Sequence, residues 1–328
     1  MQNKSGKVKR TVLNIIKALA VPLFVWALFE IILISTSGTG VITNSADVKT
    51  FFRNLISSLA FALAISTNLS SGRMDLSLGA QMYVGVIFGG NIATSLNLGG
   101  VGVLVLSMII GGICGLVTGL LFVNMRILPM VLGLGITLIF ECVSFSVNNQ
   151  QGIILYGKEG VDILSSAPFI IAIVAVLIIV TTFLFQFSGY GFKYRAIMGN
   201  QKLASDAGIN IYSNCVISYV IAGALVAVAG VFMTAYGGSL APVLGMTSNA
   251  SVFTNMFPMV LGIWIGSIVN HSQIGVLMGA ISVNVLSIAL SKLGLSSNVQ
   301  SVIVYGLFLL FVVFNRNKWR VAAERTLR

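Results

Sequence analysis

Long apolar runs, each close to the length of a membrane-spanning helix, follow one another along almost the whole chain. A bilayer core of about 30 Å needs about 20 apolar residues per helix. Short polar or glycine-containing breaks separate the runs, and two of these breaks are so short that eight to eleven crossings are compatible with the pattern. The pattern predicts an all-α fold, a polytopic transmembrane helical bundle of about ten spans with broken helices, at residues 12–34, 51–70, 75–96, 101–123, 128–147, 165–187, 213–236, 251–268, 273–290 and 298–314.

The composition is that of a membrane protein. Of the 328 residues, 57% are hydrophobic and 8% are charged, whereas a soluble domain carries about 25% charged residues. The first apolar run is longer than the core of a secretory signal, which has about 7–15 residues, so we interpret it as a retained span. We expect one transmembrane domain over residues 1–328, with cytoplasmic tails at residues 1–11 and 315–328 and one longer cytoplasmic loop at residues 188–212.

Lysine and arginine are distributed unevenly between the two sides of the predicted bundle. With ten spans, fifteen of the 19 Lys and Arg residues lie on the side of the termini, and four lie on the other side. Cytoplasmic loops carry the excess of cations in membrane proteins, so we predict that both termini are cytoplasmic. The net charge of +11 could favour nucleic acid. However, the cations are not clustered with aromatic residues on one module, and we expect no nucleic-acid partner.

The chain offers no convincing set of catalytic or metal-binding side chains. The three cysteines have no close-spaced partner, and His271 is the single histidine. A disulfide framework, a Cys/His metal site and a Ser/His/Asp triad are therefore all disfavoured. We expect no enzyme activity, no catalytic residue, no cofactor and no metal. The repeat of Gly111, Gly115 and Gly119 is typical of tight helix packing, and we assign it no substrate role.

The first candidate for a substrate path is the polar break between the second and third predicted spans. Irregular backbone is tolerated at membrane depth only beside protein or water, which favours a position next to a pore. Ser71 or Asp75 could cap the following helix. Arg73 and Asp75 are near enough in sequence to pair, and such a pair could simply hold a turn at the inner surface. The residues of this break that we expect beside the path are Ser71, Gly72, Asp75, Ser77 and Gly79.

A second interruption, rich in glycine and polar residues, lies between the eighth and ninth predicted spans. Pro258 removes a backbone hydrogen bond in mid-span, and glycines let helices approach closely. Two interrupted segments in corresponding halves of a chain indicate the central site of a transporter, although ordinary kinks and inner turns explain the same pattern. The residues that we expect beside the path here are Gly262, Gly266 and Ser267.

Two further carboxylates fall within predicted spans. A charge near the bilayer centre is costly, so each is a functional candidate by default. Glu30 is expected to reach the outer interface, and Glu141 is a lone carboxylate in the fifth span. A proton relay would need more such groups.

Two segments resemble the permease subunits of bacterial ABC importers, in the ribose/sugar (branched-chain amino acid-like) permease family. Residues 71–79, Ser-Gly-Arg-Met-Asp-Leu-Ser-Leu-Gly, look like the family's Gly-Gly-Ile-Asp-Leu-Ser signature. Residues 194–210 are similar to its cytoplasmic Ala-Ile-Gly-Gly-Asn, Ala-Ala and Ser-Gly-Ile segment. With the span pattern, the resemblance covers residues 12–314. The first signature has lost one glycine and gained Arg73, which suits one half of a heterodimeric pore or a divergent subfamily.

The second of these segments is predicted to form a short cytoplasmic helix at residues 200–209. Asn200 is a good N-cap, and Gly208 can adopt the left-handed conformation that ends a helix. The resemblance implies that this helix couples the pore to an ATPase, and a solvated loop helix is the alternative. Leu203, Ala204, Ala207 and Ile209 are expected to form its apolar surface. The residues assigned to the ATPase contact are Gly199, Asn200, Leu203, Ala204, Ala207, Gly208 and Ile209.

The resemblance implies a transmembrane permease subunit that forms the pore for a small polar solute, with a sugar as the expected cargo. The chain contains no Gly-x4-Gly-Lys-Ser/Thr phosphate loop, so a separate cytoplasmic ATP-binding cassette subunit would have to hydrolyse ATP. The other implied partners are an extracytoplasmic solute-binding protein, a second permease subunit in a homo- or heterodimer, and the lipid bilayer of the bacterial cell membrane.

Three alternatives remain open at the level of sequence. An ion- or proton-coupled secondary transporter also has broken helices, but carboxylates are scarce in the predicted spans. An ABC permease for nucleosides would share the same motifs. A membrane-embedded enzyme would need a catalytic set that the chain does not offer.

Overall fold

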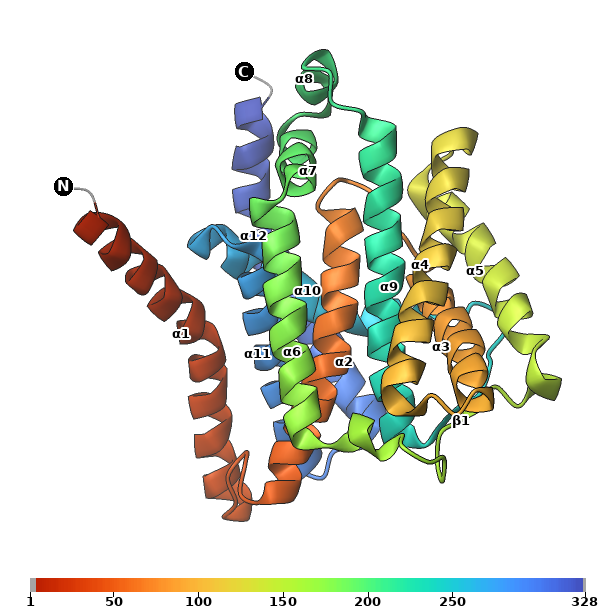
Figure 1. The fold of residues 1–328 in the computed structure, drawn as a ribbon. Helices are drawn as coiled ribbons and strands as arrows, with labels where there is room; N and C mark the ends of the chain where they lie inside the picture. Colours follow the sequence, from red (N-terminus) through yellow and green to blue (C-terminus); the bar gives the residue numbers. More distant parts are fainter. Residues whose placement is uncertain (1–3, 327–328) are drawn as a thin grey trace.

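The computed structural model describes residues 4–326, with side chains described for residue 14 and for residues 16–315. The described chain is a helical bundle, which confirms the predicted fold class (Figure 1). Two short strands, β1 (Ile153–Ile154) and β2 (Ser239–Leu240), pair antiparallel. The helices are α1 (Lys4–Ser37), α2 (Ser45–Leu69), α3 (Leu78–Ser95), α4 (Gly99–Met125), α5 (Pro129–Phe145), η1 (Asn148–Gln150), η2 (Asp162–Ser165), α6 (Ala167–Thr182), η3 (Phe183–Phe187), α7 (Gly189–Gly199), α8 (Gln201–Asp206), α9 (Ile211–Gly237), α10 (Asn249–Val269), α11 (Ser272–Lys292) and α12 (Ser297–Thr326).

Each of the ten predicted spans lies on one long helix of the bundle. Eight helical segments in the described part of the chain are long and apolar enough to cross a membrane: those of α1, α2, α4, α6 with η3, α9, α10, α11 and α12. The other two predicted spans correspond to α3 and α5, which have 18 and 17 residues. The chain is therefore a multi-pass membrane protein, with α3 and α5 as shorter helices.

Three predicted boundaries differ from the structure. α1 begins at Lys4 and α12 continues to Thr326, so the helices extend into both predicted tails. The predicted loop at residues 188–212 contains two helices, α7 and α8, where we expected only one. We did not predict the start of α7, although a local N-cap marks it. The Ser188 side chain accepts a hydrogen bond from Gly191 N at 3.1 Å.

Glycines set the closest contacts between helices. A Cβ atom on Gly111 would lie 2.4 Å from the carbonyl oxygen of Gly223, so only glycine allows α4 and α9 to approach this closely. Gly115 and Gly119 face the same helix at Tyr219. This confirms the predicted packing role of the Gly111, Gly115 and Gly119 repeat.

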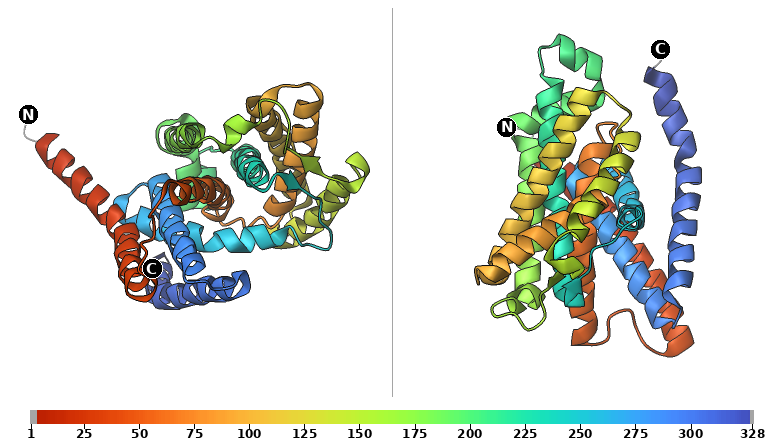
Figure 2. Two further views of the ribbon diagram at one scale, coloured as in Figure 1. Left: turned by 90° about the horizontal axis from the view of Figure 1, so that it is seen from below. Right: turned by 90° about the vertical axis from the view of Figure 1, so that its right-hand side faces the viewer.

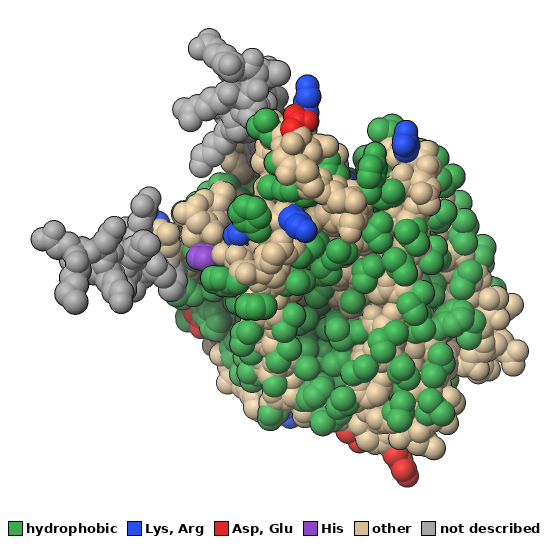
Figure 3. Space-filling view, turned by 45° about the horizontal axis from the view of Figure 1, so that its top comes forward, with side chains coloured by type: hydrophobic (Ala, Val, Ile, Leu, Met, Phe, Trp, Pro, Cys, Tyr) green, Lys and Arg blue, Asp and Glu red, His purple; other side chains and the backbone are tan. Residues whose placement is uncertain are grey.

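The two ends of the bundle differ in structure and charge. α7 and α8 lie at one end, here called the α8 end, toward which α1 begins and α12 finishes, while β1 and β2 lie at the opposite end (Figure 1). On the side shown in Figure 3, Lys and Arg side chains gather around the α8 end, and acidic side chains lie mainly toward the opposite end. The helices α10, α11 and α12 lie next to one another, with α1 beside them (Figure 2).

Candidate functional site

The first predicted break is a non-helical segment that runs from the end of α2 into the interior of the bundle. α2 stops at Leu69, a turn follows in which Gly72 has a φ of +76°, and α3 starts at Leu78. Asp75 is 3% exposed and Ser77 is fully buried. The Oδ1 atom of Asp75 accepts a hydrogen bond from Ser77 N at 2.8 Å, which orders the entry into α3. The alternative prediction, that Ser71 caps α3, is wrong. The Ser71 hydroxyl instead donates a hydrogen bond to Asn68 O at the end of α2.

The buried carboxylate of Asp75 is surrounded by neutral hydrogen-bond donors. Ser77 Oγ donates to it at 2.6 Å and Gln81 Nε2 at 3.2 Å. Gln81 Nε2 also reaches Thr118 Oγ1 on α4 at 3.3 Å. The predicted ion pair between Asp75 and Arg73 is not formed. Arg73 Nη1 instead donates a hydrogen bond to Ser71 Oγ at 3.1 Å. Among the described side chains, an ion pair forms between Lys292 and Asp47, with 2.6 Å between Lys292 Nζ and Asp47 Oδ2.

The start of α3 lies directly against the start of α10. A Cβ atom on Gly79 would lie 2.2 Å from the carbonyl oxygen of Ser248, a backbone atom that cannot move aside. Thr137 on α5 donates to the carbonyl oxygens of Gly133 at 2.8 Å and Leu76 at 3.3 Å. Helices α3, α5 and α10 therefore converge at the first break.

Glu141 fixes the segment that precedes α10. Its fully buried carboxylate accepts hydrogen bonds from Met246 N at 2.8 Å and Ser248 N at 2.9 Å. These N–H groups would otherwise lack an acceptor at the helix start. The lone carboxylate of the fifth span thus holds backbone in place. Glu30 accepts from Val41 N at 2.8 Å, in the α1–α2 connection at the end away from α8.

The second predicted interruption is smaller than its glycines indicated. α10 continues through Pro258, Gly262, Gly266 and Ser267 to Val269, and the chain turns only at Asn270, which has a φ of +61°. A Cβ atom on Gly262 would lie 2.4 Å from Val276 Cα on α11. The prediction of a broken helix is therefore wrong at Gly262 and Gly266, because these glycines serve close packing between α10 and α11.

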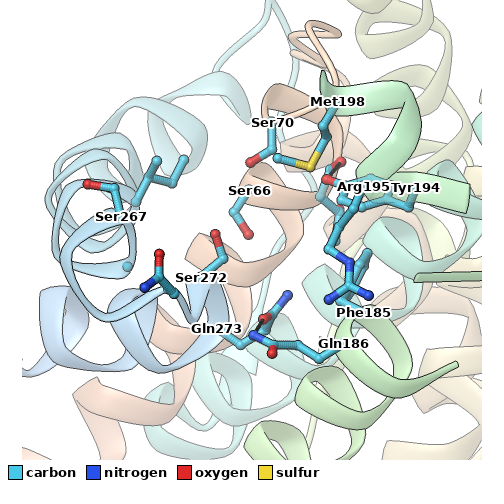
Figure 4. Close-up of a pocket in the computed structure, with 14 residues that line it drawn as sticks. Ser66, Ser70, Phe185, Gln186, Tyr194, Arg195, Met198, Ser267, Ser272 and Gln273 are labelled. Atoms are coloured by element: carbon cyan, nitrogen blue, oxygen red, sulfur yellow. Dashed lines mark hydrogen bonds between the residues drawn. The ribbon is translucent and has the colours of Figure 1, made fainter. Parts of the chain in front are cut away.

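Gly266 and Ser267 also border a cavity of about 330 Å³ near the α8 end, which we call the α7 cavity (Figure 4). Its walls come from the end of α2, from η3 and α7, and from the turn between α10 and α11. The lining residues are Ser66, Thr67, Ser70, Phe185, Gln186, Tyr194, Arg195, Met198, Ile263, Gly266, Ser267, Asn270, Ser272 and Gln273. Most of these residues are neutral and polar by type, and Arg195 is the charged member.

The structure separates the predicted path residues into three groups. Gly266 and Ser267 border the α7 cavity. Ser71 and Gly72 border a different cavity of about 360 Å³, together with Arg73 and Arg126. Asp75, Ser77, Gly79 and Gly262 are buried in contacts between helices.

The predicted coupling helix is present with its expected ends. Asn200 Oδ1 accepts from Leu203 N at 3.0 Å, and α8 then runs over Gln201–Asp206. Gly208 has a φ of +79°, and Ile209 N donates back to Ala204 O at 3.0 Å. Gly199, the last residue of α7, lies in open space.

The exposed face of α8 is narrower than predicted. Leu203 is 65% exposed, whereas Ala204 is only 4% exposed and packs inside the turn. Ala207 is exposed and Ile209 is half-buried. The expected apolar surface is therefore formed by Leu203 and Ala207, and the assignment of Ala204 to it is wrong.

Comparison with known proteins agrees with this architecture. Residues 50–313, most of the chain, match the family described as "Branched-chain amino acid transport system / permease component". The chain belongs to this permease family. It is a permease component of the ABC-transporter class, and the helical bundle with its broken α2–α3 connection is the membrane domain of that component. No solved structure matches the chain.

Several relatives of this permease are named as sugar transporters. It is 26% identical over 183 residues to the D-allose transport system permease protein of Escherichia coli, an alignment that covers 53% of this chain and 54% of that protein. It is 22% identical over 263 residues to the fructose import permease protein of Rhizobium meliloti, covering 76% and 72% of the two chains. The high-affinity branched-chain amino acid permease protein LivH of Escherichia coli is 28% identical over 169 residues, covering 51% and 52%.

Proposed function

We propose that this permease forms half of the pore of a bacterial ABC importer for a small uncharged solute, with a sugar as cargo. Its partners are a second permease subunit, a cytoplasmic ATP-binding cassette ATPase and an extracytoplasmic solute-binding protein. The relatives named for allose and fructose support the cargo class. The observation that carries the proposal is α8, a capped helix that presents exposed Leu203 at the cation-rich end of the bundle.

The orientation follows from the charges. The described cations at the α8 end include Lys193, Arg195 and Lys202. At the opposite end the cations are Lys49, Arg53, Lys158 and Lys292, and Lys292 is paired with Asp47. By the positive-inside rule the α8 end is cytoplasmic, and both termini lie on that side of the bacterial cell membrane.

α7 provides a rigid connection between α8 and the transmembrane helices. The Tyr194 hydroxyl donates to Thr67 O on α2 at 2.6 Å, and the Tyr190 hydroxyl pairs with Ser218 Oγ on α9 at 2.8 Å. A displacement of α8 would therefore move the end of α2, which leads directly into the first break. Such element shifts are a common way to convert a local contact into a change of state.

In this mechanism the α7 cavity, bordered by Gly266 and Ser267, is the cytoplasmic mouth of the path. The segment from Ser71 to Gly79 follows directly after Ser70 of the cavity wall and moves with α2, and the hydrogen bonds of Asp75 hold it in position. An ion-coupled transporter would place ionisable groups along the path, but Asp75 and Glu141 each hold backbone in place by accepting N–H hydrogen bonds.

The test is the variant Leu203→Glu in the complete transporter. A charge on this exposed side chain is expected to abolish sugar uptake and co-purification of the ATPase while membrane insertion stays normal. The matched control is Tyr156→Glu, because Tyr156 is 86% exposed in a loop at the opposite end. Normal uptake and normal ATPase binding in Leu203→Glu would refute α8 as the coupling element.

A further inference from the structure

Two adjoining cavities lie away from the α8 end, and none of the residues predicted beside the substrate path borders them. One, of about 210 Å³, lies between α2, α9 and α10. The other, of about 300 Å³, lies between α2, α10, α11 and α12. Both are bordered by Asn54, Ser58 and Asn255, so they are neighbours on either side of these side chains, and we call the two together the polar groove.

Four helices turn a neutral polar face toward this groove. On each helix the polar residues recur at intervals of three or four, the spacing that places side chains on one face. Such faces are costly against lipid tails and are stable where they meet protein or water. The polar residues are Asn54, Ser57 and Ser58 on α2; Ser251, Thr254 and Asn255 on α10; Asn284 and Ser287 on α11; and Ser297, Gln300 and Ser301 on α12.

Several of these groups have hydrogen-bonding capacity that the protein does not use. Asn284 is 5% exposed; its Nδ2 donates to Phe51 O at 2.7 Å, but its Oδ1 has no partner. The side chains of Asn54 and Ser58 make no hydrogen bond to any described residue. A buried acceptor without a partner is costly, so this space is suited to a ligand or water that donates a hydrogen bond.

The charge around the groove selects against cationic groups. Its lining residues include no Asp or Glu. The one cation, Arg53, is engaged by the ring of Tyr236 at 5.0 Å from the centroid and by Ser165 O at 3.4 Å. A zwitterionic amino acid would bring an ammonium group that finds no carboxylate here, and a charge without a partner is costly to desolvate.

We propose that the polar groove binds an uncharged, polyhydroxylated solute on its way through the permease. Hydroxyl groups both donate and accept, which matches a lining of amides and hydroxyls. Tyr236 and Tyr305 offer flat apolar surfaces for the carbon skeleton, and Tyr305 is oriented by its hydrogen bond with Thr254 at 3.1 Å. This inference rests on the proposed function and adds a binding site, with its selectivity, in the half of the pore away from α8.

The groove shares three helices with the α7 cavity: α2, α10 and α11. α2 contributes Asn54 and Ser58 to the groove and Ser66 and Thr67 to the cavity. The stretch between these pairs, around Ala62, is fully buried. The two spaces are therefore separated by packed helix in this conformation, as expected for a path that is closed between its two mouths.

The experiment measures water access and protection with cysteines. Cys114 and Cys215 are buried and Cys142 is exposed, so Cys142→Ser provides the background. In membranes containing this chain, Ser58→Cys and Asn255→Cys are treated with the charged thiol reagent MTSET. The control is Ile179→Cys, a 66% exposed position on the apolar α6, which should stay unmodified in the bilayer.

We expect both groove cysteines to react, and D-fructose or D-allose to slow the reaction about twofold at a concentration near the dissociation constant, because half of the sites are then occupied. L-Leucine at the same concentration should have no effect. Unreactive groove cysteines would indicate lipid or a partner subunit in the groove and would overturn the proposal. Equal protection by leucine, or no protection by either sugar up to molar concentration, would also overturn it.

This assay needs neither ATPase nor binding protein, so it is independent of the coupling test. Protection by sugar together with normal transport in Leu203→Glu would leave the groove standing and reject α8 as the coupling element. In the complete transporter, Asn255→Leu should reduce sugar uptake at least about tenfold, the effect of about 1.4 kcal/mol. The control is Asn124→Leu, at an exposed position outside both cavities of the groove, which should leave sugar uptake unchanged. Normal uptake in Asn255→Leu would reject the groove as part of the path.

Discussion

The carboxylate of Glu141 offers the most direct test of how the bundle is held together. Replacing it with leucine keeps the volume of the side chain similar but removes both oxygen atoms that accept backbone hydrogen bonds. The N–H groups of Met246 and Ser248 would then lose their acceptor. Because these residues precede α10, the change should loosen the contact between α3, α5 and α10.

The magnitude follows from the burial of the two donors. A buried donor without a partner costs about 1–3 kcal/mol. Ser248 is fully buried and bears this cost in full, whereas Met246 is only half-buried and water can replace part of its loss. We therefore expect Glu141→Leu to lower the free energy of unfolding by about 2–4 kcal/mol. Glu141→Gln keeps one acceptor oxygen and should lose about half as much.

The assay is thermal unfolding of the purified permease in detergent, followed by intrinsic tryptophan fluorescence. Glu159→Gln serves as the control for the loss of one negative charge, because Glu159 lies exposed in the loop before η2. The expected order of midpoint temperatures is wild type and Glu159→Gln, then Glu141→Gln, then Glu141→Leu. A midpoint for Glu141→Leu equal to that of the wild type would refute the view that this carboxylate anchors α10.

Three further predictions concern packing, the first break and topology. Gly79→Ala should destabilise the fold by more than about 2 kcal/mol because its Cβ would overlap a backbone carbonyl, whereas Gly135→Ala, which meets open space, should leave the midpoint temperature unchanged. Asp75→Asn should retain the fold, since an amide oxygen can still accept from Ser77 N, but should reduce uptake if transport depends on the negative charge; normal uptake would leave only the capping role. In intact cells, an impermeant thiol reagent should modify Ser296→Cys and spare Ala207→Cys, and the reverse result would invert the topology.

Local signals were sufficient wherever the governing interaction spans only a few residues. The two ends of α8 are an example. The N-cap at Asn200 and the left-handed turn at Gly208 depend on hydrogen bonds within one helical turn, and both were predicted from residue type. The same holds for Gly111 on α4, because a repeat of small residues is visible in the sequence itself. The position of α7 was missed because a glycine-containing segment after the sixth span reads as a loop.

Contacts between distant segments could not be predicted in the same way. Arg73 and Asp75 are two residues apart, yet the carboxylate accepts hydrogen bonds from Ser77 and Gln81, while Arg73 donates to Ser71. Glu141 meets backbone more than 100 residues away in the chain. Ala204 is buried, although we predicted it on the apolar surface of its helix.

The sequence by itself determined the class of this protein, because membrane insertion requires about 20 apolar residues per helix and an uneven placement of cations, and both are properties of composition along one dimension. Only the tertiary structure decided which polar side chains share a space. The serines and asparagines of α2, α10, α11 and α12 look like scattered polar residues within four separate apolar runs. They come together only when packing brings Asn54, Asn255 and Asn284 around the same cavity, since the spacing within a helix defines a face but does not say which face it will meet.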